Sequence, residues 1–174
     1  MFGSPRKAES ESELHDAALR ALMRRAHSVY EMRKALERRS DDAAAVKNVL
    51  ARLKREKLLD DARYAKQFAR YRTESRRQGR FRIARDLRAR GVPDRHIAAA
   101  LHEALQETDE AGAVRKRIER KLKLYRGEID ERKIASIYRS LLRAGFPSDA
   151  IRRELRSMTR EDVPEIASAS AEEE

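Results

Sequence analysis

Residues 87–101 read LRARGVPDRHIAAAL, and the same pattern occurs at two other places in the chain. The matching stretches are LERRSDDAAAVKNVL at 36–50 and LLRAGFPSDAIRREL at 141–155. Three sets of apolar residues coincide when the stretches are aligned: Leu36, Leu87 and Leu141; Val46, Ile97 and Ile151; Leu50, Leu101 and Leu155. A period of about 50 residues lies at the upper end of the range for helical repeat arrays. The chain is therefore predicted to consist of repeated helical units.

Each repeated stretch has the features of two helices joined by a tight turn. Gly91 and Gly145 stand where the first helix ends, and glycine accepts the left-handed C-cap conformation without steric cost. A Pro and an Asp follow, as at Pro93 and Asp94, and the acidic or hydroxyl side chain is expected to cap the next helix. Ser40 stands at the glycine position of the first stretch, so that turn is expected to be less tightly specified.

A further helical segment precedes each pair, at 13–26, 60–77 and 109–126, and no segment of comparable length alternates with a period of two. We therefore predict an all-α fold of three tandem three-helix repeats in an elongated, curved array. The predicted boundaries are a flexible N-terminal arm at 1–12, repeats at 13–58, 60–107 and 109–158, and a disordered acidic tail at 159–174.

Composition restricts the class of protein. Among 174 residues, 41% are charged, 5% are aromatic and none is tryptophan, so the predicted core is thin and aliphatic. The absence of cysteine excludes disulfides and thiolate chemistry and fits a reducing cytoplasm. The sequence has no run of signal-peptide or membrane-spanning length, so we expect a cytoplasmic protein without membrane contact. The formal net charge of +11 predicts a polyanionic or acidic partner.

The sequence has no catalytic constellation. Phosphate-binding, dinucleotide-binding, zinc-protease and serine-hydrolase motifs are all missing, so we expect neither enzymatic activity nor a cofactor. His96 and His102 are too far apart to share a helix face as metal ligands, and no metal site is expected. The acidic pairs at 41–42 and 60–61 precede predicted helices, where capping explains them better than acid–base catalysis.

Basic residues are concentrated in two stretches. Nine arginines at 70–90 have only Glu74 and Asp86 as counter-charges within the stretch, and seven basic residues at 115–126 have only Glu119. A solvated helix surface usually interleaves both signs, so the excess indicates contact with a polyanion or an acidic protein, with a solvated face as the alternative. The candidate partner-binding or DNA-binding residues are Arg72, Arg76, Arg77, Arg80, Arg82, Arg85, Arg88, Arg115, Lys116, Arg120 and Lys123.

Apolar and aromatic residues lie among these arginines. Ile83, Ala84 and Leu87 form a stripe that we expect to be buried, which leaves the arginines at 82, 85 and 88 to project elsewhere. Four aromatic side chains lie nearby: Tyr64, Phe68, Tyr71 and Phe81. The helical spacing of the first three favours packing, with base stacking as the alternative.

The sequence resembles the RecX family of RecA regulators. The residues that carry the resemblance are Ser28, Glu31 and Leu36, followed by LLDDARYAKQFARYR at 58–72, GRFRIARDLRARGV at 79–92 and LLRAGFPSDAIRREL at 141–155. The resemblance covers about residues 13–158, and members of this family have three tandem three-helix repeats. Ser40 and the high density of Lys and Arg in the segment at 109–126 depart from the family pattern.

The resemblance implies a function in DNA repair, recombination and the SOS response of bacteria. It implies a non-enzymatic, monomeric protein that lies in the groove of the RecA filament on single-stranded DNA, where it suppresses ATP hydrolysis, strand exchange and filament growth. Its basic residues would then contact RecA, DNA, or both. An independent helical DNA-binding module acting through its basic face is the alternative.

Overall fold

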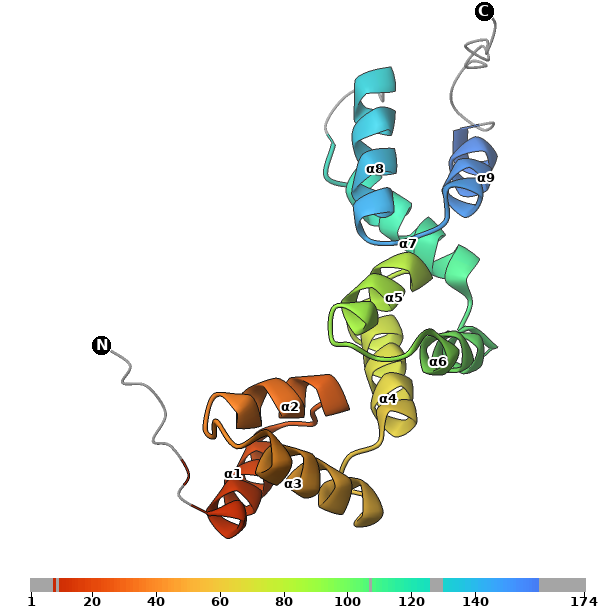
Figure 1. Ribbon diagram of the computed structural model, residues 1–174. Helices are drawn as coiled ribbons and strands as arrows, with labels where there is room; N and C mark the ends of the chain where they lie inside the picture. The colour runs from red at the N-terminus through yellow and green to blue at the C-terminus, as the bar shows by residue number, and fades with distance from the viewer. Residues whose placement is uncertain (1–7, 9, 107, 126–129, 160–174) are drawn as a thin grey trace, which may run out of the picture. The chain divides into compact units, whose positions relative to one another are not determined.

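The computed structural model describes residues 8, 10–106, 108–125 and 130–159 (Figure 1). These residues form nine α-helices and no strand, which confirms the all-α class. The chain divides into two compact units, one of Met1–Arg76 with Ile83–Thr108 and the other of Arg77–Arg82 with Asp109–Glu174. The predicted N-terminal arm falls mostly, and the acidic tail almost entirely, outside the described residues. The predicted repeat boundaries stay a prediction.

The first three helices of the first unit surround one hydrophobic cluster. They are α1 (Glu11–Arg24), α2 (Val29–Glu37) and α3 (Ala43–Arg55). Helix α1 begins two residues before its predicted start because the Ser10 side chain caps it, accepting from the Glu13 amide. The cluster contains Leu14, Ala18, Met32, Leu36, Val46, Val49, Leu50, Leu53 and Leu59. These residues recur at helical spacing, so each helix turns one apolar face inward.

The next three helices surround a second cluster. They are α4 (Asp61–Glu74), α5 (Arg80–Arg88) and α6 (Asp94–Gln106). Alanines at 65 and 69 on α4 and at 100 and 104 on α6 are buried, and such small side chains let two helices approach closely. Ile83, Ala84 and Leu87 are buried in the same cluster, which confirms the stripe predicted on α5.

The second unit contains the third cluster. Its helices are α7 (Glu110–Leu122), α8 (Glu131–Arg143) and α9 (Ser148–Thr159). The cluster contains Val114, Ile118, Ile137, Leu141, Ala144, Phe146 and Ile151. Residues 77–82, which include the first turn of α5, belong to this unit because their amides bond to the turn after α8. Gly79 and Phe81 donate to the carbonyls of Ala144 and Gly145 at 2.9 and 3.0 Å.

Both predicted turn glycines have left-handed backbone. Gly91 has φ of 68° and Gly145 has φ of 90°, which confirms the predicted C-caps. A Cβ on Gly91 would lie 2.5 Å from the Cβ of Tyr30 on α2, so this glycine also permits a close approach of two segments. The turn at Ser40 needs no positive φ, since its amide bonds back to the Leu36 carbonyl at 3.0 Å.

The acidic residues before the helices fall into two groups. Asp42 and Asp60 are N-caps and each accepts two backbone amides, as predicted. Asp94 was expected to cap α6, and this was wrong. It is the first residue of that helix, and its carboxylate accepts from Arg88 Nε at 2.7 Å. Proline precedes α6 and cannot cap with its side chain, so a Pro–Asp order places the carboxylate inside the first turn.

A buried polar link joins the two clusters of the first unit. Ser28 caps α2 in a capping box with Glu31, and its hydroxyl donates to the Arg90 carbonyl at 2.6 Å. The Glu31 carboxylate also accepts from Arg25 at 3.1 Å and from the Tyr64 hydroxyl at 3.3 Å. Burial alone would raise the pKa of Glu31, but hydrogen bonds from Arg25 and the Ser28 amide, with the charges of Arg25 and Arg90, lower it.

Candidate nucleic-acid and protein interface

Three arginines, on α4 and in the segments that follow α4 and α5, lie against aromatic rings. The guanidinium of Arg72 lies 4.8 Å from the ring centre of Phe68, and that of Arg90 lies 4.9 Å from the same ring. Arg76 lies 5.9 Å from the ring of Tyr71. Phe68 therefore contacts two cations and packs on the core, as predicted. Tyr71 was also expected to pack, and this was wrong, since it is 50% exposed.

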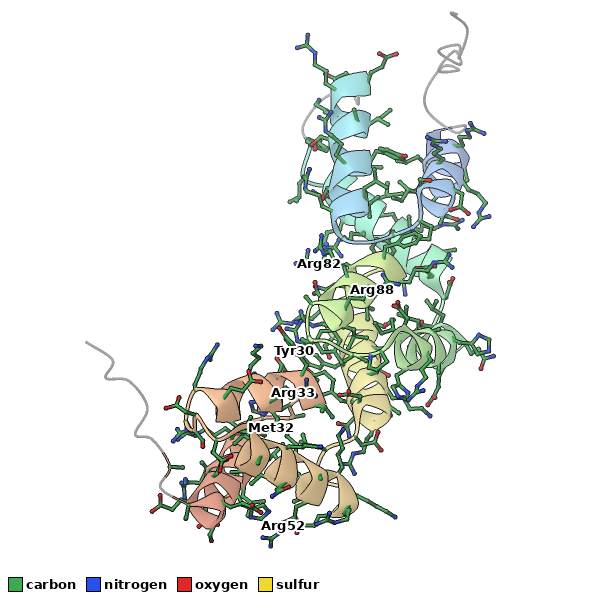
Figure 2. The ribbon with its side chains drawn as sticks, viewed as in Figure 1. Tyr30, Met32, Arg33, Arg52, Arg82 and Arg88 are labelled. Carbon is green, nitrogen blue, oxygen red and sulfur yellow. The ribbon has the colours of Figure 1, made fainter. Side chains whose placement is uncertain are left out.

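On α5 the side opposite the buried stripe carries exposed arginines. Arg85 and Arg88 are both exposed there, and Figure 2 labels Arg88 on this helix. Arg85 lies 3.7 Å from Asp86, while Arg88 pairs with Asp94. Both pairs are open to water and so hold their side chains only weakly. These guanidinium groups are accessible to a partner.

In the second unit, residues 77–82 lie beside α7. Arg80 pairs with Glu110 at 3.1 Å, and Arg117 donates to the Arg77 carbonyl at 2.7 Å. Burial lowers the pKa of Arg117, and the positive charges of Arg120, Arg82 and Arg77 lower it further. Several guanidinium groups therefore crowd one small region.

Arg82 belongs to that region, and its side chain does not lie where the sequence predicted. Its side chain was expected to project away from the core, but it is only partly exposed and donates to the Arg143 carbonyl at 3.4 Å (Figure 2). The cause is the close approach of the turn after α8, where a Cβ on Gly145 would meet the backbone of Arg82. Arg82 therefore has a structural contact in addition to its charge.

The remaining basic candidates lie on or just after α7. Arg115 donates to Glu154 of α9 at 2.8 Å, and this hydrogen bond, with the charge of Glu154, raises the pKa of Arg115. The carboxylate of Glu154 is only 7% exposed, so Arg115 compensates a buried negative charge. Lys116, Arg120 and Lys123 are exposed.

The counter-charges differ from those the sequence suggested. We expected the arginines of 70–90 to be left largely uncompensated, but Glu31, Asp94 and Glu110 pair with arginines of this stretch from outside it. Glu154 does the same for the stretch on α7. Helix packing brings Glu31, Glu110 and Glu154 to arginines that are far from them in the sequence. Fewer basic side chains lack a nearby carboxylate than the sequence implied. The uncompensated positive charge is concentrated around Arg117, where like charges surround it.

Two arginines outside the predicted set proved important. Arg117 was counted in the basic stretch but not among the candidates, and Arg90 was likewise left out. Arg90 donates to the Asp86 carbonyl at 2.6 Å and lies 3.8 Å from Glu31. No local pattern distinguishes either residue from its neighbours, because the contacts of Arg90 with Glu31 and of Arg117 with the Arg77 carbonyl join segments far apart in the sequence.

The part of the chain that the structure describes contains no group of three or more residues placed to hold a metal ion. Within the same residues, no helix is both long enough and apolar enough to span a membrane. The features left to explain function are the exposed arginines of the first unit and the crowded guanidinium groups of the second.

These features define an all-α protein that presents basic surfaces for binding. The family model described as "RecX, second three-helix domain" matches residues 60–101. A regulatory protein RecX of Halorhodospira halophila is 41% identical over 143 residues, which cover 80% of this chain and 84% of that protein. The regulatory protein RecX of Prosthecochloris aestuarii is 34% identical, over 75% of this chain and 83% of its own length.

Two crystal structures share the fold. One, of a regulatory protein RecX, has a TM-score of 0.75 at 21% identity and covers 84% of this chain and 73% of its own. The other, of RecX from Lactobacillus salivarius, has a TM-score of 0.73 at 20% identity, over 86% and 97% of the two chains. The chain belongs to the RecX family of regulatory proteins, which confirms the resemblance seen in the sequence.

Proposed function

We propose that this protein is a non-enzymatic inhibitor of RecA that binds in the groove of the RecA filament on single-stranded DNA. Bound there, it suppresses ATP hydrolysis, strand exchange and filament growth. The observation that carries the proposal is the 41% identity to a regulatory protein RecX over 80% of the chain. The interaction with RecA is what membership of the family implies.

The basic surfaces support this proposal. The groove of a nucleoprotein filament presents phosphates and carboxylates, and exposed guanidinium groups bind both with charge-assisted hydrogen bonds. Arg72, Arg76, Arg85 and Arg88 contribute from the first unit, and Arg77, Arg80, Arg120, Lys116 and Lys123 from the second. Arg82 and Arg115 also have structural contacts, so their contribution to binding is smaller.

The alternative is a DNA-binding module that acts without RecA. In such a module the helix after the turn, here α6, would read the major groove. Its exposed side chains are Asp94, Arg95, Ala98, Ala99, His102, Glu103 and Gln106. Two alanines and two acidic residues give such a helix little capacity to bind bases or phosphates, so this alternative has less support than RecA inhibition.

The deciding experiment measures ATP hydrolysis by the RecA of the same organism on single-stranded DNA, with increasing amounts of this protein. We expect inhibition at fewer molecules of this protein than of RecA, since one bound molecule in the groove would contact several protomers. If an excess leaves ATP turnover unchanged while the protein still binds DNA, the DNA-binding module replaces RecA inhibition as the proposed function.

A further inference from the structure

The structure separates the aromatic residues that the sequence grouped together. Tyr64 is buried, and Phe68 packs on the core and contacts Arg72 and Arg90. Phe81 is 61% exposed, although it stands at the beginning of α5 with its amide bonded to the Gly145 carbonyl. Its backbone is therefore fixed by the second unit while its ring faces solvent. Packing accounts for Tyr64 and Phe68 but leaves Phe81 unexplained.

The residues around Phe81 carry an unusual concentration of positive charge. Arg80 lies 5.8 Å from the centre of the Phe81 ring. Arg77 and Arg82 come from the same short segment, and Arg117 binds the Arg77 carbonyl. Burial lowers the pKa of Arg117 most, and the charges of Arg120, Arg82 and Arg77 lower it further, so three guanidinium groups repel that of Arg117 here. An anion between them would relieve this repulsion.

Arg77 is also unfavourable for the backbone. Its φ is 48°, in the left-handed region that glycine and asparagine occupy more readily than residues with long side chains. Strained residues of this kind cluster at functional sites. Since glycine at this position would favour folding, the presence of arginine points to a function of its side chain.

We propose that Phe81 and the guanidinium groups of Arg77, Arg82, Arg117 and Arg120 form a binding site for single-stranded nucleic acid. A base stacks on the exposed Phe81 ring, and the adjoining phosphates bind to the guanidinium groups. Exposed aromatic rings beside a basic groove are typical of single-strand binding proteins. This inference rests on the proposed function, because it assigns a ligand to part of the same basic surface.

Two other anionic ligands fit less well. An acidic peptide would neutralise the arginines but would leave the Phe81 ring without a flat partner. Duplex DNA offers phosphates, but its base faces are stacked inside the helix and are closed to an aromatic side chain. Only a single strand supplies both a phosphate and an accessible base face.

The test measures binding of the whole chain to labelled oligothymidylate and to an abasic strand of the same length, in the absence of RecA. Phe81→Leu is expected to weaken binding to oligothymidylate by about tenfold, from the stacking of one base, and to leave abasic binding unchanged. Tyr30→Leu, which removes an exposed aromatic ring from α2 in the first unit, is the matched control and is expected to change binding less than twofold.

The arginines are tested by the salt dependence of the same binding. Arg77→Gly and Arg120→Gln are each expected to flatten the log–log slope by about 0.7, the value for one lost single-strand contact. Arg77→Gly relieves the strained backbone, so it is not expected to unfold the protein. Arg132→Gln, which removes an exposed charge from the first turn of α8, is the control and is expected to keep the slope of the wild type.

Three results would overturn the site. The first is that Phe81→Leu weakens binding to the abasic strand as much as to oligothymidylate. The second is that unlabelled polyglutamate displaces the labelled strand as well as unlabelled oligothymidylate does. The third is that Arg77→Gly and Arg120→Gln leave the salt dependence of binding unchanged. These outcomes are independent of RecA. If the protein inhibits RecA but Phe81→Leu binds oligothymidylate normally, only the proposed site is contradicted. If the protein binds single strands through Phe81 but does not affect RecA, only the proposed function is contradicted.

Discussion

The hydroxyl of Ser28 donates a hydrogen bond to the carbonyl oxygen of Arg90 at 2.6 Å, across 62 positions of the sequence. The Ser28 hydroxyl oxygen also accepts a hydrogen bond from the Glu31 amide at 3.1 Å and so begins α2. Ser28 is fully buried, which makes one small side chain both the cap of a helix and the link between two clusters. Local and long-range structure in the first unit therefore depend on the same atom.

Ser28→Ala is expected to lower the free energy of unfolding by about 2 kcal/mol, because the helix loses its cap and the Arg90 carbonyl loses a buried donor. Urea denaturation followed by circular dichroism measures this. Ser136→Ala, at an exposed position on α8, is the control and is expected to change stability by less than about 0.5 kcal/mol. Equal stability of the two variants would contradict the role of Ser28.

Gly91→Val tests the turn between α5 and α6. The left-handed φ of 68° opposes a β-branched residue, and an added Cβ would meet Tyr30. We expect a loss of about 1 to 3 kcal/mol in thermal or chemical unfolding. Gly112→Ala is the comparison: Gly112 lies inside α7 without a positive φ, and its substitution displaces only the Asp109 side chain that caps α7, so we expect a smaller loss of about 1 kcal/mol. A Gly91 variant that unfolds like the wild type would show that the turn adapts.

The link at Glu31 predicts a specific dependence on pH. Because folding lowers the pKa of Glu31, its stabilising effect is complete above its ordinary value of 4.5 and is lost as the pH falls through the lower value of the folded state. Glu31→Gln is expected to be less stable than wild type by about 1 to 2 kcal/mol at neutral pH, and the difference should shrink in acid.

The control for this experiment is Glu37→Gln, which removes an exposed carboxylate from the end of the same helix. It is expected to change the free energy of unfolding by less than about 1 kcal/mol at either pH, as exposed ion pairs do. A constant difference between Glu31→Gln and wild type across the acid range would show that the charge of Glu31 does not stabilise the fold.

Part of this structure follows from sequence pattern. The coincidence of Leu87 and Leu141, and of Gly91 and Gly145, predicted helices that end in left-handed turns, because periodicity and glycine chemistry are local properties. The buried side of α5 followed from the same reasoning. Its outward arginines, at 85 and 88, were located correctly for that reason.

The partners of the charged residues could not be predicted in this way. Glu154 is a buried carboxylate on α9, and only the packing of α7 against α9 brings it to Arg115. The approach of Gly145 to Arg82 similarly depends on how residues 77–82 meet the turn after α8. Sequence spacing determines which face of a helix a residue occupies, but not which distant helix covers that face.

The pair of Arg115 and Glu154 gives a prediction that separates structure from binding. Arg115→Gln leaves the buried Glu154 carboxylate without the Arg115 donor. The melting temperature of this variant should therefore fall below that of wild type. Lys116→Gln removes the same charge from the next, exposed position and should melt like wild type. Differential scanning calorimetry measures both. If the two variants melt together, Arg115 acts only as a surface charge.

The last prediction concerns the exposed arginines of α5. The double variant Arg85→Gln with Arg88→Gln leaves the buried Ile83 and Leu87 unchanged, and glutamine keeps helix propensity nearly constant, so the fold should be retained. Each guanidinium takes part only in a solvent-exposed pair, whose loss has little effect on stability. We expect the concentration that half-inhibits the RecA ATPase to rise about 3- to 10-fold, as two peripheral charged contacts are removed.

The matched control is Arg20→Gln with Arg24→Gln, which removes two exposed charges from α1 and so changes the net charge equally. If long-range attraction by net charge alone accounted for inhibition, both double variants would weaken it by the same factor. A larger effect of the α5 variant, at matched thermal stability, would place these guanidinium groups in the contact with the filament. Equal effects would mean that the arginines of α5 are a solvated helix face.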